Sequence, residues 1–249
     1  MIILSTDVET TGVDKVNDRI TEIGLVLYST GQKRVLESSG FLVRPEGVPI
    51  TPEVTEITGI TQIAVDTFGY SQEDAIKEFA AAAQTADAIF AHNGERFDRR
   101  VIENTAKRLG LTLPEKLWVD TMTDIPGVKG EQLVTMCAKA GFVYDAHGAL
   151  ADCAAVVKLT QYHDAKSSQS SYDKMLERAQ SPTVVILSHQ GRDKAENKAA
   201  RKAGFRWNGD FKIWWKPVKD MDVSELASKV PFDISRAGKE YSLEVLQED

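Results

Sequence analysis

The sequence predicts an α/β fold in which helices flank a mixed five-stranded sheet, followed by a small α+β module. Three strand-like segments come first with short connections, which is typical of an antiparallel meander. Two short apolar segments then alternate with helical ones, which is the pattern of an α/β layer. A different pattern, rich in aromatic and basic residues, begins near residue 182 and predicts the separate module.

The first strand brings two acidic residues together at its end. The apolar run 2–4 is typical of a strand buried on both faces. Asp7 and Glu9 follow, and since side chains alternate along a strand, both carboxylates point to the same side. A bound cation would relieve their repulsion. Among 37 acidic residues in 249, about five or six such pairs arise by chance, so this pair indicates a metal site only if other carboxylates join it.

The other elements of the first domain follow from periodicity and from residues that begin or end helices. Four further strands are expected, at residues 19–28, 35–43, 87–91 and 117–119. Five helices are expected, at residues 51–59, 71–84, 98–109, 130–140 and 149–164. Thr51 and Pro52 are typical of a helix start, and Gly59 and Gly110 are typical of helix ends.

The amino-acid composition indicates the cellular compartment that we expect for this protein. A chain of 249 residues with 42% apolar content can bury a sizeable core. Cys137 and Cys153 are too few for a disulfide framework, which favours a reducing, cytoplasmic setting. No apolar run approaches the roughly 20 residues of a membrane helix, and the N-terminus lacks the features of a signal peptide. We therefore expect no contact with a membrane and an N-terminus that belongs to the fold.

Three segments are expected along the chain: a domain at 1–165, a linker at 166–181 and a C-terminal module at 182–249. Small polar residues at 165–171 are typical of a linker or a frayed helix end. Within the module we expect a strand at 183–187, a helix at 194–203 and a hairpin that turns at Asn208-Gly209.

The C-terminal module is basic although the chain as a whole is acidic. Residues 189–219 hold nine Lys/Arg against three Asp/Glu, a net charge of +6. The whole chain carries −7, so the remainder carries −13. Such asymmetry is typical of polyanion binding by the basic region.

Aromatic residues beside these cations predict contacts with single-stranded nucleic acid. The candidates are Lys198, Lys202, Arg206, Trp207, Lys212, Trp214 and Trp215. The alternative is that the aromatic side chains form the core of a small hairpin. In a regular strand Trp214 and Trp215 face opposite ways, so at most one of them would then belong to the core. Residues 199–217 are also similar to a small module attached to other DNA-processing proteins.

Three further candidate catalytic or metal-binding residues lie later in the first domain. Asp98 and Asp152 each fall in the first turn of an expected helix, where an acid also suits the helix dipole. Five helical residues rotate about 500°, so His147 shares a face with Asp152 only if it lies on the loop. Gly148 would then give the backbone the freedom to aim the imidazole over Asp152. Taken singly, each of these residues also fits a capping or solvated role.

Taken together, the motifs resemble the DEDDh (DnaQ-like) class of 3′–5′ exonucleases, which includes the proofreading subunit of bacterial replicative polymerases, RNase T and the three-prime repair exonucleases. Three segments within residues 1–165 carry the resemblance: Ser5-Thr-Asp-Val-Glu-Thr-Thr-Gly12, Ala91-His-Asn-Gly-Glu-Arg-Phe-Asp98 and His147-Gly-Ala-Leu-Ala-Asp152. The spacing in the second is closest to the three-prime repair enzymes. Asp120-Thr121 and residues 52–61 are similar to accessory stretches, with Thr58 where relatives often carry His. The resemblance implies a ribonuclease H-like fold.

The resemblance also implies a metal-dependent exonuclease that releases nucleoside monophosphates from 3′ ends. Carboxylates without a thiol cluster suit Mg²⁺ or Mn²⁺, and four of them can hold two ions about 3.5–4 Å apart. Asp7 would bridge both ions, with Glu9, Asp98 and Asp152 as the other ligands. His147 would take a proton from the attacking water, which suits the ordinary histidine pKa of about 6.5.

Substrate contacts follow from the same resemblance. Thr10, Thr11 and nearby backbone would hold the 3′-terminal nucleotide, Ile60 would pack on a base, and Asn93 would support the site. Single-stranded DNA ends are the expected substrate, but nothing in residues 1–165 excludes a 2′-hydroxyl, so trimming of RNA 3′ ends stays open. The alternative of a non-catalytic nucleic-acid-binding adaptor is disfavoured by the presence of all five site residues. An endonuclease of the ribonuclease H kind is disfavoured too, because His-x4-Asp is not its signature. A replication or repair protein is the expected kind of protein partner.

Overall fold

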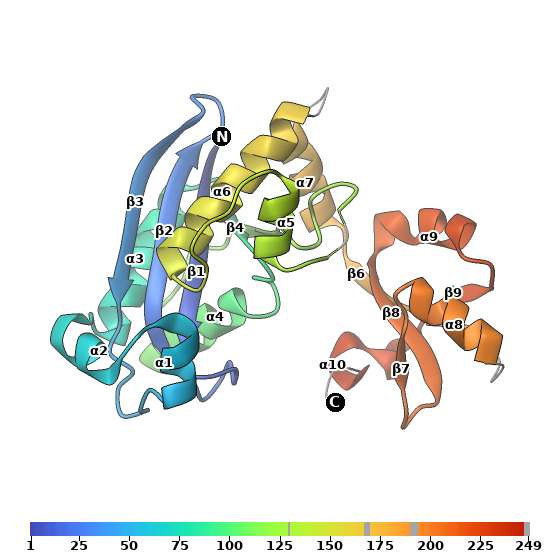
Figure 1. Cartoon of the computed structure of the whole chain (residues 1–249), viewed down its shortest axis with the longest axis horizontal. Coiled ribbons are helices and arrows are strands. Elements are labelled where there is room, and N and C mark those ends of the chain that lie inside the picture. Colours follow the sequence, from blue (N-terminus) through green and yellow to red (C-terminus); the bar gives the residue numbers. More distant parts are fainter. Residues whose placement is uncertain (129, 167–169, 190–193, 247–249) are drawn as a thin grey trace. The chain divides into compact units, whose positions relative to one another are not determined.

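The computed structural model describes residues 1–128, 130–166, 170–189 and 194–246, which form two compact units (Figure 1). Unit 1 spans Met1–Ala179 and unit 2 spans Gln180–Asp249. Across the ranges just given, no helix has both the length and the apolar character needed to cross a membrane.

The boundary between the units lies later than the sequence suggested. The segment 166–181, which we expected to be a linker, contains helix α7 (Ser171–Gln180). Tyr172 and Met175 of this helix are buried among apolar side chains of unit 1. These two anchors attach α7 to unit 1, so the small polar residues before it do not separate two domains.

Unit 1 contains the predicted mixed five-stranded sheet, and its strand order is β3-β2-β1-β4-β5. Its strands are β1 (Ile2–Thr10), β2 (Ile20–Ser29), β3 (Arg34–Leu42), β4 (Ala88–Ala91) and β5 (Leu117–Asp120). β1 pairs antiparallel with β2 and parallel with β4. The strand with the first pair of acids therefore lies at the centre of the sheet.

Helices cover both faces of this sheet (Figure 1). The helices before α7 are α1 (Pro52–Thr58), α2 (Gln62–Phe68), α3 (Gln72–Thr85), α4 (Asp98–Leu109), α5 (Leu133–Lys139) and α6 (Ala149–Lys166). Apolar side chains of α3 and α4 pack against one face, and those of α5, α6 and α7 pack against the other. Leu4 belongs to the first core and Ile3 to the second, as expected for a strand buried on both faces.

The residues that begin and end the helices act as the sequence predicts. The side chain of Thr51 accepts the N–H of Val54 at the start of α1. Gly59 and Gly110 end α1 and α4 with φ angles of 72° and 69°, a left-handed conformation that favours glycine. Helix α2 was not predicted, although it begins at a capping residue, Thr61.

Unit 2 contains a four-stranded sheet with the order β7-β8-β6-β9. Its strands are β6 (Thr183–Ser188), β7 (Arg206–Asn208), β8 (Ile213–Lys219) and β9 (Ile234–Arg236). The predicted hairpin joins β7 to β8. Its connection is longer than the expected Asn-Gly turn, because Asn208 ends β7 and its side chain accepts the N–H groups of Asp210 and Phe211.

Both faces of this second sheet are covered. The helical elements are α8 (Lys194–Lys202), η1 (Asp220–Asp222), α9 (Val223–Lys229), η2 (Lys239–Tyr241) and α10 (Leu243–Leu246). Side chains of α8 and α9 pack with Trp214, and side chains of η2 and α10 pack with Trp215. Trp214 is 5% exposed and Trp215 is 3% exposed. The expectation that at most one of them belongs to a core was wrong, because a sheet covered on both faces has two cores. Neither indole is therefore free to stack on a base.

Candidate active site

Three carboxylates from two elements converge at one end of the central strand. Asp7 and Glu9 lie on β1, and Asp152 lies in the first turn of α6. One oxygen of each lies within 4.8 Å of the others, and all three side chains are partly buried. The structure thus brings a third carboxylate to the pair that the sequence analysis identified.

Asp98 lies against the same strand. It begins α4, is 3% exposed, and its Oδ1 accepts the N–H of Val8 at 2.9 Å. Val8 separates Asp7 from Glu9 in the sequence, so this hydrogen bond holds the Asp98 carboxyl group beside the acidic pair. Four acidic side chains from three elements therefore share one region of unit 1.

Burial and repulsion from neighbouring charges favour the protonated forms of Asp7, Glu9 and Asp98. Burial, followed by the charges of Asp98 and Asp152, raises the pKa of Asp7 well above its usual range. Burial and then Asp152 raise the pKa of Glu9 to about 8. Burial raises the pKa of Asp98 to about 7, although the hydrogen bond from Val8 opposes this shift. Within the described ranges no Lys or Arg forms an ion pair with any of them, so a divalent cation is the natural source of compensating charge.

Two glycines let the start of α6 approach the sheet. Gly24 lies opposite Asp7 on β2, and a Cβ atom there would lie 2.3 Å from the backbone oxygen of Ala149. Gly40 pairs with Gly24 across β2 and β3, and a Cβ atom there would lie 2.8 Å from Cβ of Leu150. Larger residues would push the first turn of α6 away from β1. Neither position was predicted from the sequence, although glycine inside a strand can indicate close approach.

A fifth carboxylate, Glu22, holds the start of α6. Glu22 lies directly opposite Glu9 on β2, and its Oε2 accepts the N–H of Ala149 at 2.9 Å. A carboxylate at a helix N-terminus stabilises the helix through its dipole. The charge of Glu22 also raises the pKa of Glu9 and that of Asp7. Glu22 was not predicted from the sequence, because its proximity to Glu9 follows from the strand register and not from any local motif.

The loop before α6 surrounds Asp152 with two donors. The hydroxyl of Tyr144 donates to Oδ1 at 2.5 Å, and the backbone N–H of His147 donates to Oδ2 at 3.0 Å. His147 itself has a φ angle of 68°, so the left-handed residue of this loop is His147, next to the Gly148 to which we assigned the backbone freedom. The imidazole of His147 is on an exposed residue, as the prediction of a loop position requires. Tyr144 was not identified from the sequence, because seven residues separate it from Asp152.

The second motif is organised around a buried aspartate, Asp120. Its Oδ1 accepts the N–H groups of Asn93 at 2.8 Å and of Met122 at 3.0 Å. Asn93 has a φ angle of 60°, which turns the chain between β4 and α4. Burial raises the pKa of Asp120 to about 6. Asp120 thus fixes Asn93 through the Asn93 backbone. From the sequence, Asp120 was predicted only as part of an accessory stretch.

The side chains expected to contact the terminal nucleotide are largely buried. Thr10 is 7% exposed, while Thr11 and Ile60 are each 6% exposed. The hydroxyl of Thr10 donates to the backbone oxygen of Gly12, and that of Thr11 donates to Asp18 at 2.8 Å. A nucleotide bound at these positions would therefore meet backbone groups.

Comparison with known proteins agrees with this geometry. Residues 4–160 match the family model named RNase_T and described as Exonuclease. A DNA polymerase III of the PolC type from Caldanaerobacter subterraneus subsp. tengcongensis is 32% identical over 195 residues. That match covers 73% of this chain but only 12% of the polymerase, so the chain corresponds to a small part of this relative.

Solved structures share the fold of unit 1. The zinc-bound complex of E. coli ExoI with single-stranded DNA has a TM-score of 0.63 at 17% identity, and the match covers 75% of this chain and 47% of that one. The nuclease domain of 3′hExo, a DEDDh family member bound to rAMP, has a TM-score of 0.55 at 20% identity, with 64% and 88% covered. These neighbours identify the mixed sheet as ribonuclease H-like. Since the family model covers the segment that holds all three motifs in their DEDDh order, the chain belongs to the RNase_T exonuclease family, as a member of its DnaQ-like DEDDh class.

Proposed function

We propose that this protein is a 3′–5′ exonuclease that uses two divalent metal ions to release nucleoside monophosphates from single-stranded DNA. The observation that carries the proposal is the convergence of Asp7, Glu9 and Asp152 within 4.8 Å in a chain of the exonuclease family. A neighbour of the same fold was solved with single-stranded DNA, which supports this class of substrate.

The donor set fits hard divalent cations. Asp7, Glu9 and Asp152 offer carboxylate oxygens within 4.8 Å of one another, and Asp98 lies beside them through its hydrogen bond from Val8. The free thiols of the described chain are buried, so this donor set suits Mg²⁺ or Mn²⁺. The raised pKa values of Asp7, Glu9 and Asp98 indicate negative charge that nearby cations do not compensate. When bound, two such ions would stabilise the attacking and leaving oxygens of a phosphodiester.

The chain's own residues would supply proton transfer and orientation. His147 lies on the loop beside Asp152 with an exposed side chain, where its imidazole would accept the proton of the attacking water. Tyr144 would keep the Asp152 carboxylate in one orientation through its hydrogen bond. We assign the terminal nucleotide to the segments that carry Thr10, Thr11, Ile60 and Asn93, with backbone groups making the contacts.

RNA 3′ ends are the second candidate substrate. The nuclease domain of 3′hExo was solved with rAMP, a ribonucleotide. DNA is favoured as the substrate because the PolC-type relative is a DNA polymerase. The same relative suggests a replication or repair protein as partner.

Degradation of end-labelled strands tests the proposal. Single- and double-stranded DNA and RNA of one sequence are labelled at either the 5′ or the 3′ end and incubated with Mg²⁺. A 3′–5′ exonuclease shortens 5′-labelled strands stepwise and releases a labelled mononucleotide at once from 3′-labelled strands. Asp7→Asn should abolish both reactions and leave the melting temperature in EDTA equal or higher. Release from the 5′ end, or wild-type rates for Asp7→Asn, would contradict the proposal.

A further inference from the structure

Unit 2 presents an exposed indole at the edge of its sheet. Trp207 of β7 lies directly opposite Trp214 of β8, so both project from the same face. Their ring centroids are 5.4 Å apart, yet Trp207 is 46% exposed whereas Trp214 is buried. The core of unit 2 therefore covers the second ring and leaves much of the first in contact with solvent.

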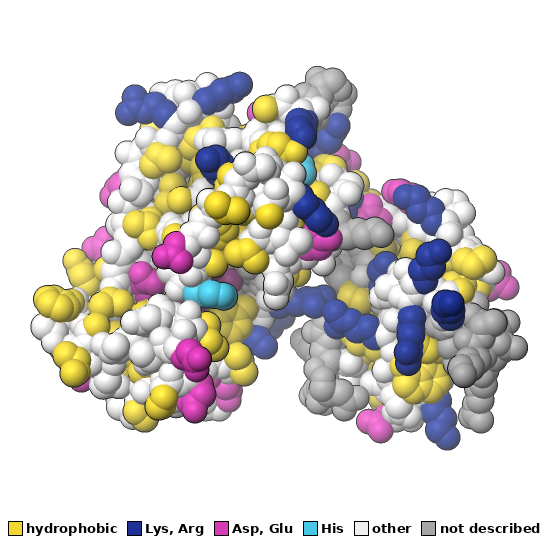
Figure 2. Space-filling view, in the orientation of Figure 1, with side chains coloured by type: hydrophobic (Ala, Val, Ile, Leu, Met, Phe, Trp, Pro, Cys, Tyr) yellow, Lys and Arg dark blue, Asp and Glu magenta, His cyan; other side chains and the backbone are white. Residues whose placement is uncertain are grey.

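Helix α8 lies over the same face and supplies cations. Ala200 packs in the apolar cluster of Trp214, and the guanidinium of Arg201 lies 5.8 Å from the Trp214 ring centroid. Lys198, Arg201 and Lys202 are exposed and stand at i, i+3 and i+4, so they share one side of the helix. Lys and Arg side chains gather over α8 in the space-filling view (Figure 2). Among the side chains that the structure describes, none of these three cations forms an ion pair.

The position of α8 is fixed by contacts at its end. Nζ of Lys216 on β8 donates to the backbone oxygen of Ala203 at 2.8 Å. Phe205, which follows the helix, is buried in the same cluster as Trp214. The cations of α8 and the ring of Trp207 are thus held on one packed unit. Arg192, which adds to the charge of the stretch 189–219, lies outside the described residues.

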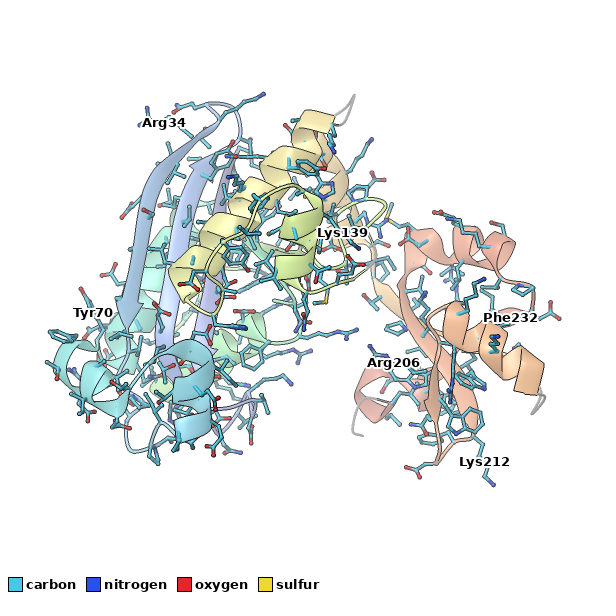
Figure 3. All side chains as sticks on the ribbon, viewed as in Figure 1. Arg34, Tyr70, Lys139, Arg206, Lys212 and Phe232 are labelled. Carbon is cyan, nitrogen blue, oxygen red and sulfur yellow. The ribbon has the colours of Figure 1, made fainter. Side chains whose placement is uncertain are left out.

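The opposite face of the hairpin offers a contrast. Arg206 lies opposite Trp215 and 5.8 Å from its ring centroid, and Phe211 is 43% exposed beside Tyr241. Lys212 projects from the tip of the hairpin (Figure 3). The predicted contact Arg206 is therefore on the face opposite the α8 cations, and Lys212 is at the tip of the hairpin.

We propose that Lys198, Arg201, Lys202 and Trp207 form a binding surface for single-stranded nucleic acid. The Trp207 ring would stack on a base while the three cations contact phosphates, which is how such surfaces hold strands of any sequence. The surface lies outside residues 4–160, so the match to the exonuclease family does not account for it. Since both units belong to one chain, a strand bound by unit 2 has a raised effective concentration near unit 1. Delivery of the strand to the active site of unit 1 is the only part of this proposal that depends on the proposed function.

Binding of a fluorescein-labelled 20-nucleotide oligothymidylate to the full chain in EDTA tests the surface without turnover. Trp207→Ala should weaken binding about 5- to 100-fold, the loss expected when stacking on one base is removed. Phe211→Ala is the matched control, because Phe211 has similar exposure on the other face. It should bind within about twofold of the wild type, as most surface substitutions do.

The three cations are tested together by Lys198→Gln/Arg201→Gln/Lys202→Gln. Each phosphate contact on a single strand contributes about 0.7 to the slope of log K against log salt, so this variant should flatten the slope by about 2. All three side chains are exposed, and an unchanged melting temperature will show that the fold is kept. Unchanged slope and affinity would overturn the proposal. Equal competition by polyglutamate of the same charge would overturn it too, and would indicate a docking site for an acidic protein.

Cleavage of a dinucleotide separates this proposal from the proposed function. A dinucleotide has no distant phosphates, so the Trp207 and triple variants should cleave it at the wild-type rate, whereas Asp7→Asn should not. If the wild type binds the oligonucleotide through this surface but cleaves nothing, the exonuclease proposal fails and the surface stands. If the dinucleotide is cleaved but the triple variant binds like the wild type, the surface fails and the exonuclease proposal stands.

Discussion

The hydroxyl of Tyr144 donates a 2.5 Å hydrogen bond to Oδ1 of Asp152, on the oxygen opposite the one that accepts the His147 N–H. The loop before α6 therefore fixes the orientation of this carboxylate before any cation binds. Groups that orient a metal ligand in this way typically change metal affinity about 10- to 100-fold when removed.

Tyr144→Phe removes the donor and keeps the ring, so it should weaken Mg²⁺ binding by about 10-fold or more. Calorimetric titration of Mg²⁺ in the absence of nucleic acid measures this directly. Tyr162→Phe is a suitable control, because Tyr162 lies on α6 away from the acidic cluster and its hydroxyl accepts from Lys166. Equal Mg²⁺ affinity in Tyr144→Phe and the wild type would show that the hydrogen bond does not position Asp152.

Glu9 should make stability depend on pH when divalent ions are absent. The folded state keeps the Glu9 proton up to a pKa of about 8, whereas the ordinary value of 4.5 applies to the unfolded chain. Between these values the folded state binds more protons, so stability should fall as pH rises, by at most about 1.4 kcal/mol per pH unit for one proton.

Melting temperatures in EDTA across this pH range provide the measurement. Glu9→Gln should flatten the dependence, because the amide does not ionise. Glu37→Gln, at an exposed position of β3, should leave it unchanged. Mg²⁺ at high pH should raise the melting temperature of the wild type more than that of Glu9→Gln. A wild-type curve that rises with pH throughout this window would contradict the assignment.

Gly24→Ala should displace the start of α6. The added Cβ atom would lie 2.3 Å from the backbone oxygen of Ala149, so the first turn of the helix must move and carry Asp152 with it. We expect a loss of about 1–3 kcal/mol in stability and at least about a tenfold loss of exonuclease rate.

Thermal melts and single-turnover digestion of an oligonucleotide measure these two effects. Gly31→Ala is the control, since a Cβ atom at Gly31 would have nothing within 4 Å. If Gly24→Ala digests DNA like the wild type, the close approach of α6 to β2 is not needed for the geometry of the site.

His147→Asn should slow the chemical step and leave metal binding intact. The substitution removes the imidazole but keeps the backbone N–H that Asp152 accepts, and Asn tolerates the left-handed φ angle of 68°. Removal of a general base typically costs about 10²- to 10⁴-fold, which single-turnover rates at saturating Mg²⁺ would reveal. A rate near that of the wild type would assign His147 to a structural role only.

Local sequence patterns determined much of the secondary structure, because periodicity and helix caps act over a few residues. Although helices α2 and α7 were not predicted, the order of the five strands of unit 1, the glycines that end α1 and α4, and the position of Asp98 in the first turn of α4 all follow from the sequence. So does the common direction of Asp7 and Glu9, since alternation along a strand depends on nothing else. The motif spacing was sufficient to indicate the family as well.

Contacts between distant segments were decided only by the tertiary structure. The strand register places Glu22 opposite Glu9, and the missing side chains of Gly24 and Gly40 let α6 approach the sheet. In unit 2, packing on both faces of the sheet buries Trp214 and Trp215 together. None of these follows from a local pattern, because each depends on which elements pack together and how closely their backbones approach. A sequence can therefore identify the carboxylates of such a site, whereas their separation and protonation depend on the packing around them.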